Sequence, residues 1–279
     1  MITDIQGLIK SITKQIKEFT DIAVIGLSGG ADSTLVATLC VQALGNNKVF
    51  GVHMPADRFD LSTFNSDSTK LAKHLGINSI TVPVGGIAEM LQEEIITKIW
   101  KNPSSHPTTK LTKGNMKARL RMTILYSIVE ELSNSFFDDK VRVMGTDNLS
   151  ENFIGYFTKY GDGGVDCNPI GELFKSEVYQ VLQYFVDTKY LPENLINKIP
   201  SAGLWEGQTD EGELGFTYNE IEESIKTYYN SYITSHVNTD SKCFQFVEQM
   251  HDKNNHKNKI PESFSLRRFC DWEYDHDYK

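Results

Sequence analysis

A short apolar run, followed at once by a glycine turn and then a helix, constrains the fold of this chain more than any other feature. Residues 21–27 read DIAVIGL, which predicts a buried β-strand, and the turn SGGADS follows directly. After the turn, Leu35, Val36 and Leu39 recur at helical spacing. Open α/β sheets bind ligands at the carboxyl ends of their strands, so this turn lies where a ligand is expected.

The rest of the chain extends this pattern into a larger α/β fold. Strands that alternate with helices are typical of a doubly wound, mostly parallel sheet with helices on both faces. We expect a single domain over residues 1–279, with a nucleotide-binding α/β core in 1–200 and a loop, a helical extension and a tail in 201–279. The further predicted strands are 48–54, 79–82 and 141–145; the predicted helices are 5–16, 67–75, 87–100, 114–132 and those after residue 217; the predicted loops are the glycine-rich stretch 155–171 and the polar stretch 201–215.

Composition excludes several classes of protein. The 279 residues carry a net charge of −9, which argues against sequence-independent nucleic-acid binding, because such binding requires a basic face. No apolar stretch approaches the ~20 residues of a membrane span, and the first residues do not resemble a secretory signal. The four cysteines, Cys40, Cys167, Cys243 and Cys270, lack zinc-site spacing and are too few for a disulfide framework. We expect a cytoplasmic protein with no membrane or nucleic-acid partner.

The turn after the first strand has the residues of a phosphate-binding loop. Gly29 and Gly30 let the backbone approach a ligand, and the start of the next helix offers free N–H groups and a positive dipole end. Ser28 and Ser33 add hydroxyl donors. Asp32 by itself would repel phosphate, but a magnesium ion accepts oxygens from both groups. The simpler alternative is a tight turn in which Asp32 only favours the helix N-terminus.

The same turn resembles the SGGxDS loop of the adenylating ATP pyrophosphatases, which cleave ATP between its α and β phosphates. Four further strings narrow the resemblance: KGNMKARLRM (113–122), MGTDNLSENFIGYFTKYGDGGVDCNPI (144–170), DEGELGFTYNEI (210–221) and the pair His256-Lys257. Over about residues 5–261 the chain is similar to the ammonia-dependent NAD synthetases. The resemblance implies an adenine nucleotide alpha hydrolase-like fold and a ligase that forms a C–N bond.

The resemblance also implies a reaction and its partners. ATP, with magnesium, adenylates the carboxylate of nicotinic acid adenine dinucleotide and releases pyrophosphate. Ammonia then attacks the carbonyl, AMP leaves, and NAD is formed. The family resemblance implies a homodimer, whose interface we expect on the helix 114–132, where Met122, Leu125 and Ile128 lie beside the core-facing residues; a helix that faces only the core is the alternative. The chain has no recognisable glutaminase part, so free ammonia is the expected nitrogen donor.

Site residues are carried over where the motifs match. ATP contacts are expected from Gly26, Leu27, Ser28, Gly29, Gly30, Ala31, Asp32, Ser33, Thr146, Lys175 and Ser201, the last of which stands where the family usually has Thr. Magnesium is expected on Asp32 and Glu151. Contacts with the acid dinucleotide are expected from Arg119, Lys159, Asp166, His256 and Lys257. Asp162 is expected beside the incoming ammonia, where it would orient it or accept a proton.

Each of these residues also has a simpler interpretation. Glu151 alone is typical of a helix start, Arg119 of a solvated helix face, Asp162 of a turn, and His256-Lys257 of a charged surface. Two other functions compete with the family reading: an adenylating enzyme that acts on a different acid or base, and a non-catalytic nucleotide-binding module. The first would usually carry an RNA-binding module or catalytic cysteines, and the second would need no paired metal carboxylates.

Overall fold

A four-stranded parallel sheet forms the centre of the described residues, which are 1–56, 66–105, 108–196, 209–231 and 240–261 of the computed structural model. The strands are β1 (Ile22–Gly26), β2 (Val49–His53), β3 (Asn78–Thr81) and β4 (Val141–Met144), in the order β3-β2-β1-β4. Val24 of β1 lies opposite Phe50 of β2 and Val143 of β4. This sheet, with helices on both faces, confirms the predicted fold class.

Helices cover both faces of the sheet because β1 is apolar on each side. Ala23 and Ile25 belong to one core, and Ile22 and Val24 to another, all without solvent exposure. The first core is completed by α1 (Ile5–Phe19), α2 (Ala31–Leu44), α3 (Asp67–Leu75) and α7 (Lys175–Asp187), and the second mainly by α5 (Lys110–Ser135), against which α4 (Gly85–Ile99) packs.

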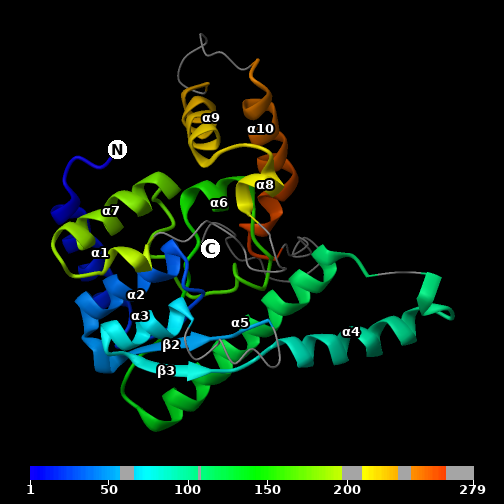
Figure 1. Ribbon diagram of the computed structural model, residues 1–279, viewed down its shortest axis with the longest axis horizontal. Helices are drawn as coiled ribbons and strands as arrows, with labels where there is room; N and C mark the ends of the chain where they lie inside the picture. Colours follow the sequence, from blue (N-terminus) through cyan, green and yellow to red (C-terminus); the bar gives the residue numbers. More distant parts are fainter. Residues whose placement is uncertain (57–65, 106–107, 197–208, 232–239, 262–279) are drawn as a thin grey trace, which may run out of the picture.

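A smaller helical layer lies beyond the sheet. It consists of α6 (Leu149–Ile154), α8 (Asp210–Leu214), α9 (Tyr218–Ser231) and α10 (Lys242–Asn254), and the short 3-10 turn Asn255–Lys257 follows α10. Further 3-10 turns lie at Asn46–Lys48, Pro103–Ser105 and Glu193–Leu195, outside this layer. Its own core joins Phe153 and Ile154 of α6 to Ile221 of α9 and Val247 of α10. Figure 1 shows α9 and α10 side by side above α6, with α8 between them and the rest of the molecule.

Several element boundaries differ from the sequence prediction, and α7 was not among the predicted helices. The helix predicted to open at Gly114 begins at Lys110, because Thr109 caps it and accepts a hydrogen bond from the Thr112 amide. The stretch predicted as a loop over 201–215 contains the short helix α8, capped in the same way by Thr209. In Figure 1, α4 and the chain leading to α5 project beyond the sheet. In the part of the chain that the structure describes, no helix is both long enough and apolar enough to span a bilayer.

Candidate active site

The predicted phosphate loop lies at the carboxyl end of β1, where the chain turns sharply into α2. Gly29 has φ = 73°, and a Cβ at this position would lie 2.9 Å from the backbone nitrogen of Ser68. Only glycine accepts both conditions. The Ser28 hydroxyl accepts a hydrogen bond from the Gly30 amide (3.1 Å) and lies 3.0 Å from that of Ser33. The turn is therefore fixed by its own side chains before any ligand arrives.

Two of the predicted carboxylates meet at one lysine. The Nζ of Lys175 lies 2.5 Å from Asp32 Oδ2 and 3.1 Å from Glu151 Oε1. Asn148 links the same two residues, because its amide group donates to Asp32 Oδ1 (3.0 Å) and accepts from the Glu151 amide (3.1 Å). The side chain of Lys175 is 5% exposed, and those of the carboxylates are 16% and 15% exposed. Residues more than 140 positions apart thus form one ion cluster at the end of the sheet.

A third carboxylate, Asp147, stands beside this ion cluster. Asp147 is 6% exposed, and its Oδ2 has no hydrogen-bond partner among the described residues. Burial, followed by the charges of Asp162, Glu151 and Asp32, raises the pKa of Asp147 well above its ordinary value. We call Asp32, Asp147, Glu151 and Lys175 the acidic cluster. It contains more negative than positive groups, so it favours a bound cation.

The pKa shifts in the acidic cluster reflect its excess of negative over positive groups. Burial raises the pKa of Glu151; Lys175 opposes the rise and Asp32 adds to it, which leaves the value at about 7. Burial alone lowers the pKa of Lys175, but Glu151 and Asp32 outweigh it, so the net shift is upward and the lysine stays charged.

The donor set of the acidic cluster fits magnesium. Carboxylate oxygens are the hard ligands that Mg²⁺ prefers, and the buried Asp147 Oδ2 is a further oxygen nearby that has no hydrogen-bond partner among the described residues. Within the described residues, however, no three His, Cys, Asp or Glu side chains form a closed metal cage. A metal at Asp32 and Glu151 would therefore need oxygens from a bound phosphate group, as is usual for Mg²⁺ at nucleotide sites.

The basic residues predicted for the dinucleotide also come together. Arg119 Nε donates to the carbonyl of Lys159 (3.4 Å), and Lys159 Nζ donates to the carbonyl of His256 (2.8 Å). Lys257 Nζ donates to the carbonyls of Gly155 (2.7 Å) and Phe157 (2.9 Å). We call Arg119, Lys159, His256 and Lys257 the basic group; Arg119 and His256 are exposed and the two lysines half-buried. Burial lowers the pKa of Lys257, and the charge of Asp162 partly offsets this.

The two aspartates of the glycine-rich loop have structural partners. The backbone amide of Thr158 donates to Asp162 Oδ1 (3.0 Å), which matches the turn-forming alternative. Asp162 is an exposed residue, yet the protein around its carboxyl group raises the pKa of that group by desolvation. Asp166 accepts hydrogen bonds from the Val143 amide (2.8 Å) and the Tyr126 hydroxyl (3.2 Å), so it ties the loop to β4 and α5. The roles of both aspartates toward ligands stay predictions.

The remaining predictions fall in different places. Thr146 is half-buried in the turn between β4 and α6. Ser201 lies outside the described residues. Cys40 is fully buried in the core that contains α2, as expected for a structural thiol. Arg119 itself is exposed on α5, whereas Arg121 Nε donates to the carbonyl of Met54 (3.2 Å) and burial lowers the pKa of Arg121.

Several residues that line the site were not assigned from the sequence. Asp147 and Asn148 stand in the same string as Thr146, but nothing in their local pattern distinguishes a partner of Asp32 from an ordinary turn. Tyr218 and Glu222 lie in or next to the string 210–221, which was recognised but received no role. Their contacts depend on the packing of α9 against α6 and α7, which residue spacing does not reveal.

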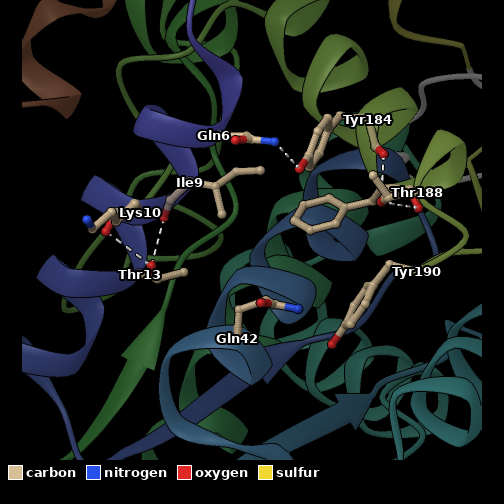
Figure 2. A pocket seen from close by; sticks show the side chains of 9 residues that line it. Gln6, Ile9, Lys10, Thr13, Gln42, Tyr184, Thr188 and Tyr190 are labelled. Carbon is tan, nitrogen blue, oxygen red and sulfur yellow. Dashed lines mark hydrogen bonds between the residues drawn. The ribbon is translucent and has the colours of Figure 1, made fainter.

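An open surface pocket lies elsewhere, between α1, α2 and α7. Figure 2 shows Gln6 and Tyr184 meeting across it, and their side chains are hydrogen-bonded at 3.1 Å. None of the predicted site residues lines this pocket. The acidic cluster and the basic group, rather than this pocket, are the candidate active site.

Comparison with known proteins places the chain in a family. The family model described as NAD synthase matches residues 3–261. The NH(3)-dependent NAD(+) synthetase of Methanosarcina mazei is 39% identical over 242 residues, which cover 85% of this chain and 88% of the relative. The enzyme of the same description from Carboxydothermus hydrogenoformans is 41% identical over 239 residues, covering 86% and 87%.

Solved structures agree with this result. The NH3-dependent NAD synthetase from Campylobacter jejuni, in complex with nitrate, superposes with a TM-score of 0.72 at 29% identity, covering 95% of this chain and all of the other. An NMN synthetase from Francisella tularensis gives a TM-score of 0.76 at 29% identity with the same coverage. Enzymes of this family use ATP and are ligases. The chain therefore belongs to the NAD synthase family, and its activity is the ammonia-dependent synthesis of NAD.

Proposed function

We propose that the chain makes NAD through an adenylated intermediate. A carboxylate does not react with ammonia at neutral pH, because oxide is too poor a leaving group. In the proposed first step, a carboxylate oxygen of nicotinic acid adenine dinucleotide attacks the α-phosphorus of ATP, and the bond to pyrophosphate breaks. In the second, ammonia forms a C–N bond, the bond to AMP breaks, and the nitrogen loses a proton.

The observation that carries this proposal is the position of the acidic cluster. Asp32 and Glu151 meet at Lys175 directly beside the glycine turn, at the carboxyl ends of β1 and β4. Lys175 is held charged there and offers a cation to the ATP phosphates. Bound magnesium, held by Asp32 and Glu151, would supply charge neutralisation for the leaving pyrophosphate.

The basic group is suited to bind the second substrate, nicotinic acid adenine dinucleotide. Arg119 and His256 expose cationic or polar groups next to the glycine-rich loop, where phosphates and a carboxylate of the acid dinucleotide can be bound. Asp162, also exposed in that loop, lies close enough to Asp147 and Lys257 to influence the pKa of each. This proximity supports the proposal that Asp162 orients ammonia or accepts a proton from it between the acidic cluster and the basic group.

The test is pyrophosphate release with purified protein. We expect release with ATP, Mg²⁺ and nicotinic acid adenine dinucleotide, NAD formation only when ammonium is added, and no NAD with ammonia-free glutamine as sole donor. Nicotinic acid mononucleotide is the matched substrate control, because one solved neighbour is an NMN synthetase. Faster turnover of the mononucleotide would show that the proposed substrate is wrong, and pyrophosphate-independent NAD formation would exclude the adenylate.

We further propose a homodimer, but with a different interface from the one expected. Leu125 of α5 is buried in the sheet core and Ile128 packs against that core, which supports the core-only alternative for that helix. Five exposed apolar side chains lie instead on α4 at helical spacing: Ile87, Met90, Leu91, Ile95 and Ile99. Met90 and Ile99 are each 63% exposed. A continuous apolar stripe of this kind marks an interaction surface, and a second copy fits the family resemblance.

Light scattering on charge-introducing variants tests the interface. Met90→Glu with Ile99→Glu should shift the protein toward monomer, whereas the neighbouring exposed change Glu89→Gln should leave its mass unchanged. A wild-type monomer at assay concentration, with full activity, would contradict the dimer.

A further inference from the structure

The string 210–221 is the one recognised motif without a role in the proposed chemistry. It forms α8 and the first turn of α9, and its apolar residues Leu214 and Ile221 join the small helical core. Two polar side chains of α9, Tyr218 and Glu222, are nevertheless 5% and 3% exposed. Buried polar groups are retained where they are hydrogen-bonded, so their partners indicate what they do.

Tyr218 contacts the acidic cluster directly. Its hydroxyl lies 3.0 Å from Glu151 Oε1 and 3.0 Å from Asp210 Oδ2, and Lys175 Nζ lies 5.2 Å from the centre of its ring. Burial and the three neighbouring carboxylates raise the pKa of Tyr218, so the phenol stays protonated and remains a donor. The oxygen of Glu151 that it meets is the same one that accepts from Lys175.

Glu222 binds the residues that are adjacent in sequence to Glu151 and Lys175. Its Oε1 accepts from the Ser150 hydroxyl (3.2 Å) and the Ser176 amide (2.9 Å), and its Oε2 accepts from the Ser176 hydroxyl (2.5 Å). The Ser150 hydroxyl in turn accepts from the Lys175 amide (3.0 Å). Ser150 precedes Glu151, and Ser176 follows Lys175.

These hydrogen bonds give the first backbone amides of α7 acceptors that lie on other helices. The first amides of a helix have no partner within it and usually require a capping side chain. Here Lys175 and Ser176, the first two residues of α7, donate to Ser150 of α6 and Glu222 of α9. A single buried carboxylate therefore fixes the starts of α6 and α7 relative to each other, and with them the distance between Glu151 and Lys175.

From these contacts we propose that Tyr218 and Glu222 are positioning residues for the ATP half of the reaction. Glu222 sets the spacing of Glu151 and Lys175, and Tyr218 aims the Glu151 carboxylate. The inference rests on the proposed roles of Glu151 and Lys175 toward magnesium-bound ATP. Neither residue contacts the basic group, so their loss should affect ATP use and leave dinucleotide binding unchanged.

The experiment compares matched substitutions on one helix. Tyr218→Phe and Glu222→Gln are paired with the exposed controls Tyr229→Phe and Glu223→Gln. With the full-length enzyme, kcat and KM are measured for MgATP and, separately, for nicotinic acid adenine dinucleotide, with thermal unfolding of each variant. We expect kcat/KM for MgATP to fall on the order of tenfold in each test variant, as for loss of one buried hydrogen bond to a charged group, with the dinucleotide KM and both controls unchanged.

Each result separates the inference from the proposed function. A Tyr218→Phe enzyme that folds and keeps wild-type kcat/KM for MgATP overturns the role of Tyr218, and the same holds for Glu222→Gln. An equal loss for both substrates, with a lowered melting temperature, shows a merely structural role and also overturns it. If Glu222→Gln does not fold, the near-isosteric Tyr218→Phe decides. Wild-type NAD formation without ATP would instead remove the proposed function itself.

Discussion

The acidic cluster and the basic group differ in how their charged side chains are stabilised. The acidic cluster is largely buried, and its carboxylates are held by a lysine of α7, a tyrosine of α9 and the asparagine that caps α6. The basic group lies nearer the surface, and its long side chains donate mainly to backbone carbonyls of the glycine-rich loop and the 3-10 turn after α10. Buried charges must be paired, whereas exposed ones are screened by water. Substitutions should therefore have large effects in the first region and small ones in the second.

The largest effect is expected from Asp32→Ala. This change removes a predicted magnesium ligand and one partner of Lys175, so pyrophosphate release should fall by about a thousandfold, or about 4 kcal/mol of transition-state stabilisation. The exposed Asp187→Ala on α7 is the control and should keep full activity. Turnover of Asp32→Ala within tenfold of wild type would show that this carboxylate does not hold the metal.

Lys175→Met tests how far the acidic cluster depends on its single cation. Without Lys175, Asp32 and Glu151 face each other as unpaired, mostly buried carboxylates, which should reduce the free energy of unfolding by about 3 kcal/mol. Lys226→Met removes an exposed pair with Glu223 and should cost about 1 kcal/mol or less. Urea unfolding measures both, and equal losses would remove the contrast between buried and exposed pairs.

The pH dependence of the free energy of unfolding is expected to be a smaller effect, and its direction can be predicted. The pKa of Glu151 is about 7 in the folded protein against an ordinary 4.5, so the folded state binds the proton more tightly. Protonated Glu151 therefore stabilises the folded protein below pH 4.5, and this stabilisation is lost as the pH rises through 7. The pKa difference of 7 − 4.5 = 2.5 sets an upper limit of about 3 kcal/mol on its contribution to the free energy of unfolding.

Comparison with Glu151→Gln isolates this contribution. Wild type and variant should unfold at similar urea concentrations near pH 4, and the variant should be the more stable one at pH 8. A wild-type protein that gains stability over Glu151→Gln as the pH rises would show that Lys175 pairing outweighs burial at this carboxylate.

The parts of the fold that follow from local sequence were predicted well. Ile22, Ala23, Val24 and Ile25 are all apolar, and successive residues of a strand point to opposite faces, so both faces of this strand must be covered by other elements. In the structure both faces are buried under helices. Gly29 follows the strand directly, and its φ of 73° with a close neighbour explains why the turn needs glycine. The convergence of Asp32 and Glu151 also followed, because both stand at carboxyl ends of strands in one parallel sheet.

The supporting residues could not be predicted in the same way. Asp147 is an unremarkable turn residue until burial leaves its Oδ2 without a partner. Glu222 follows Ile221 in an amphipathic helix, where a glutamate is normally solvated, and only the packing of α9 across α6 and α7 buries it. The dimer interface expected on helix 114–132 stays a prediction, but the fold gives it little support for a related reason: Leu125 faces the sheet core in the folded chain, while α4 carries the exposed apolar stripe.

The smallest effect is expected in the basic group. Arg119 is exposed and makes one long hydrogen bond, so Arg119→Gln should change the free energy of unfolding by no more than about 0.5 kcal/mol. If its guanidinium binds a phosphate or carboxylate of the acid dinucleotide, KM for that substrate should rise about tenfold with kcat unchanged. Added salt should raise the wild-type KM and narrow its difference from the variant, because screening weakens an exposed ion pair. Lys113→Gln, also exposed on α5, is the control. A loss of kcat with unchanged KM would place Arg119 in the chemical step and would erase the distinction between the two regions.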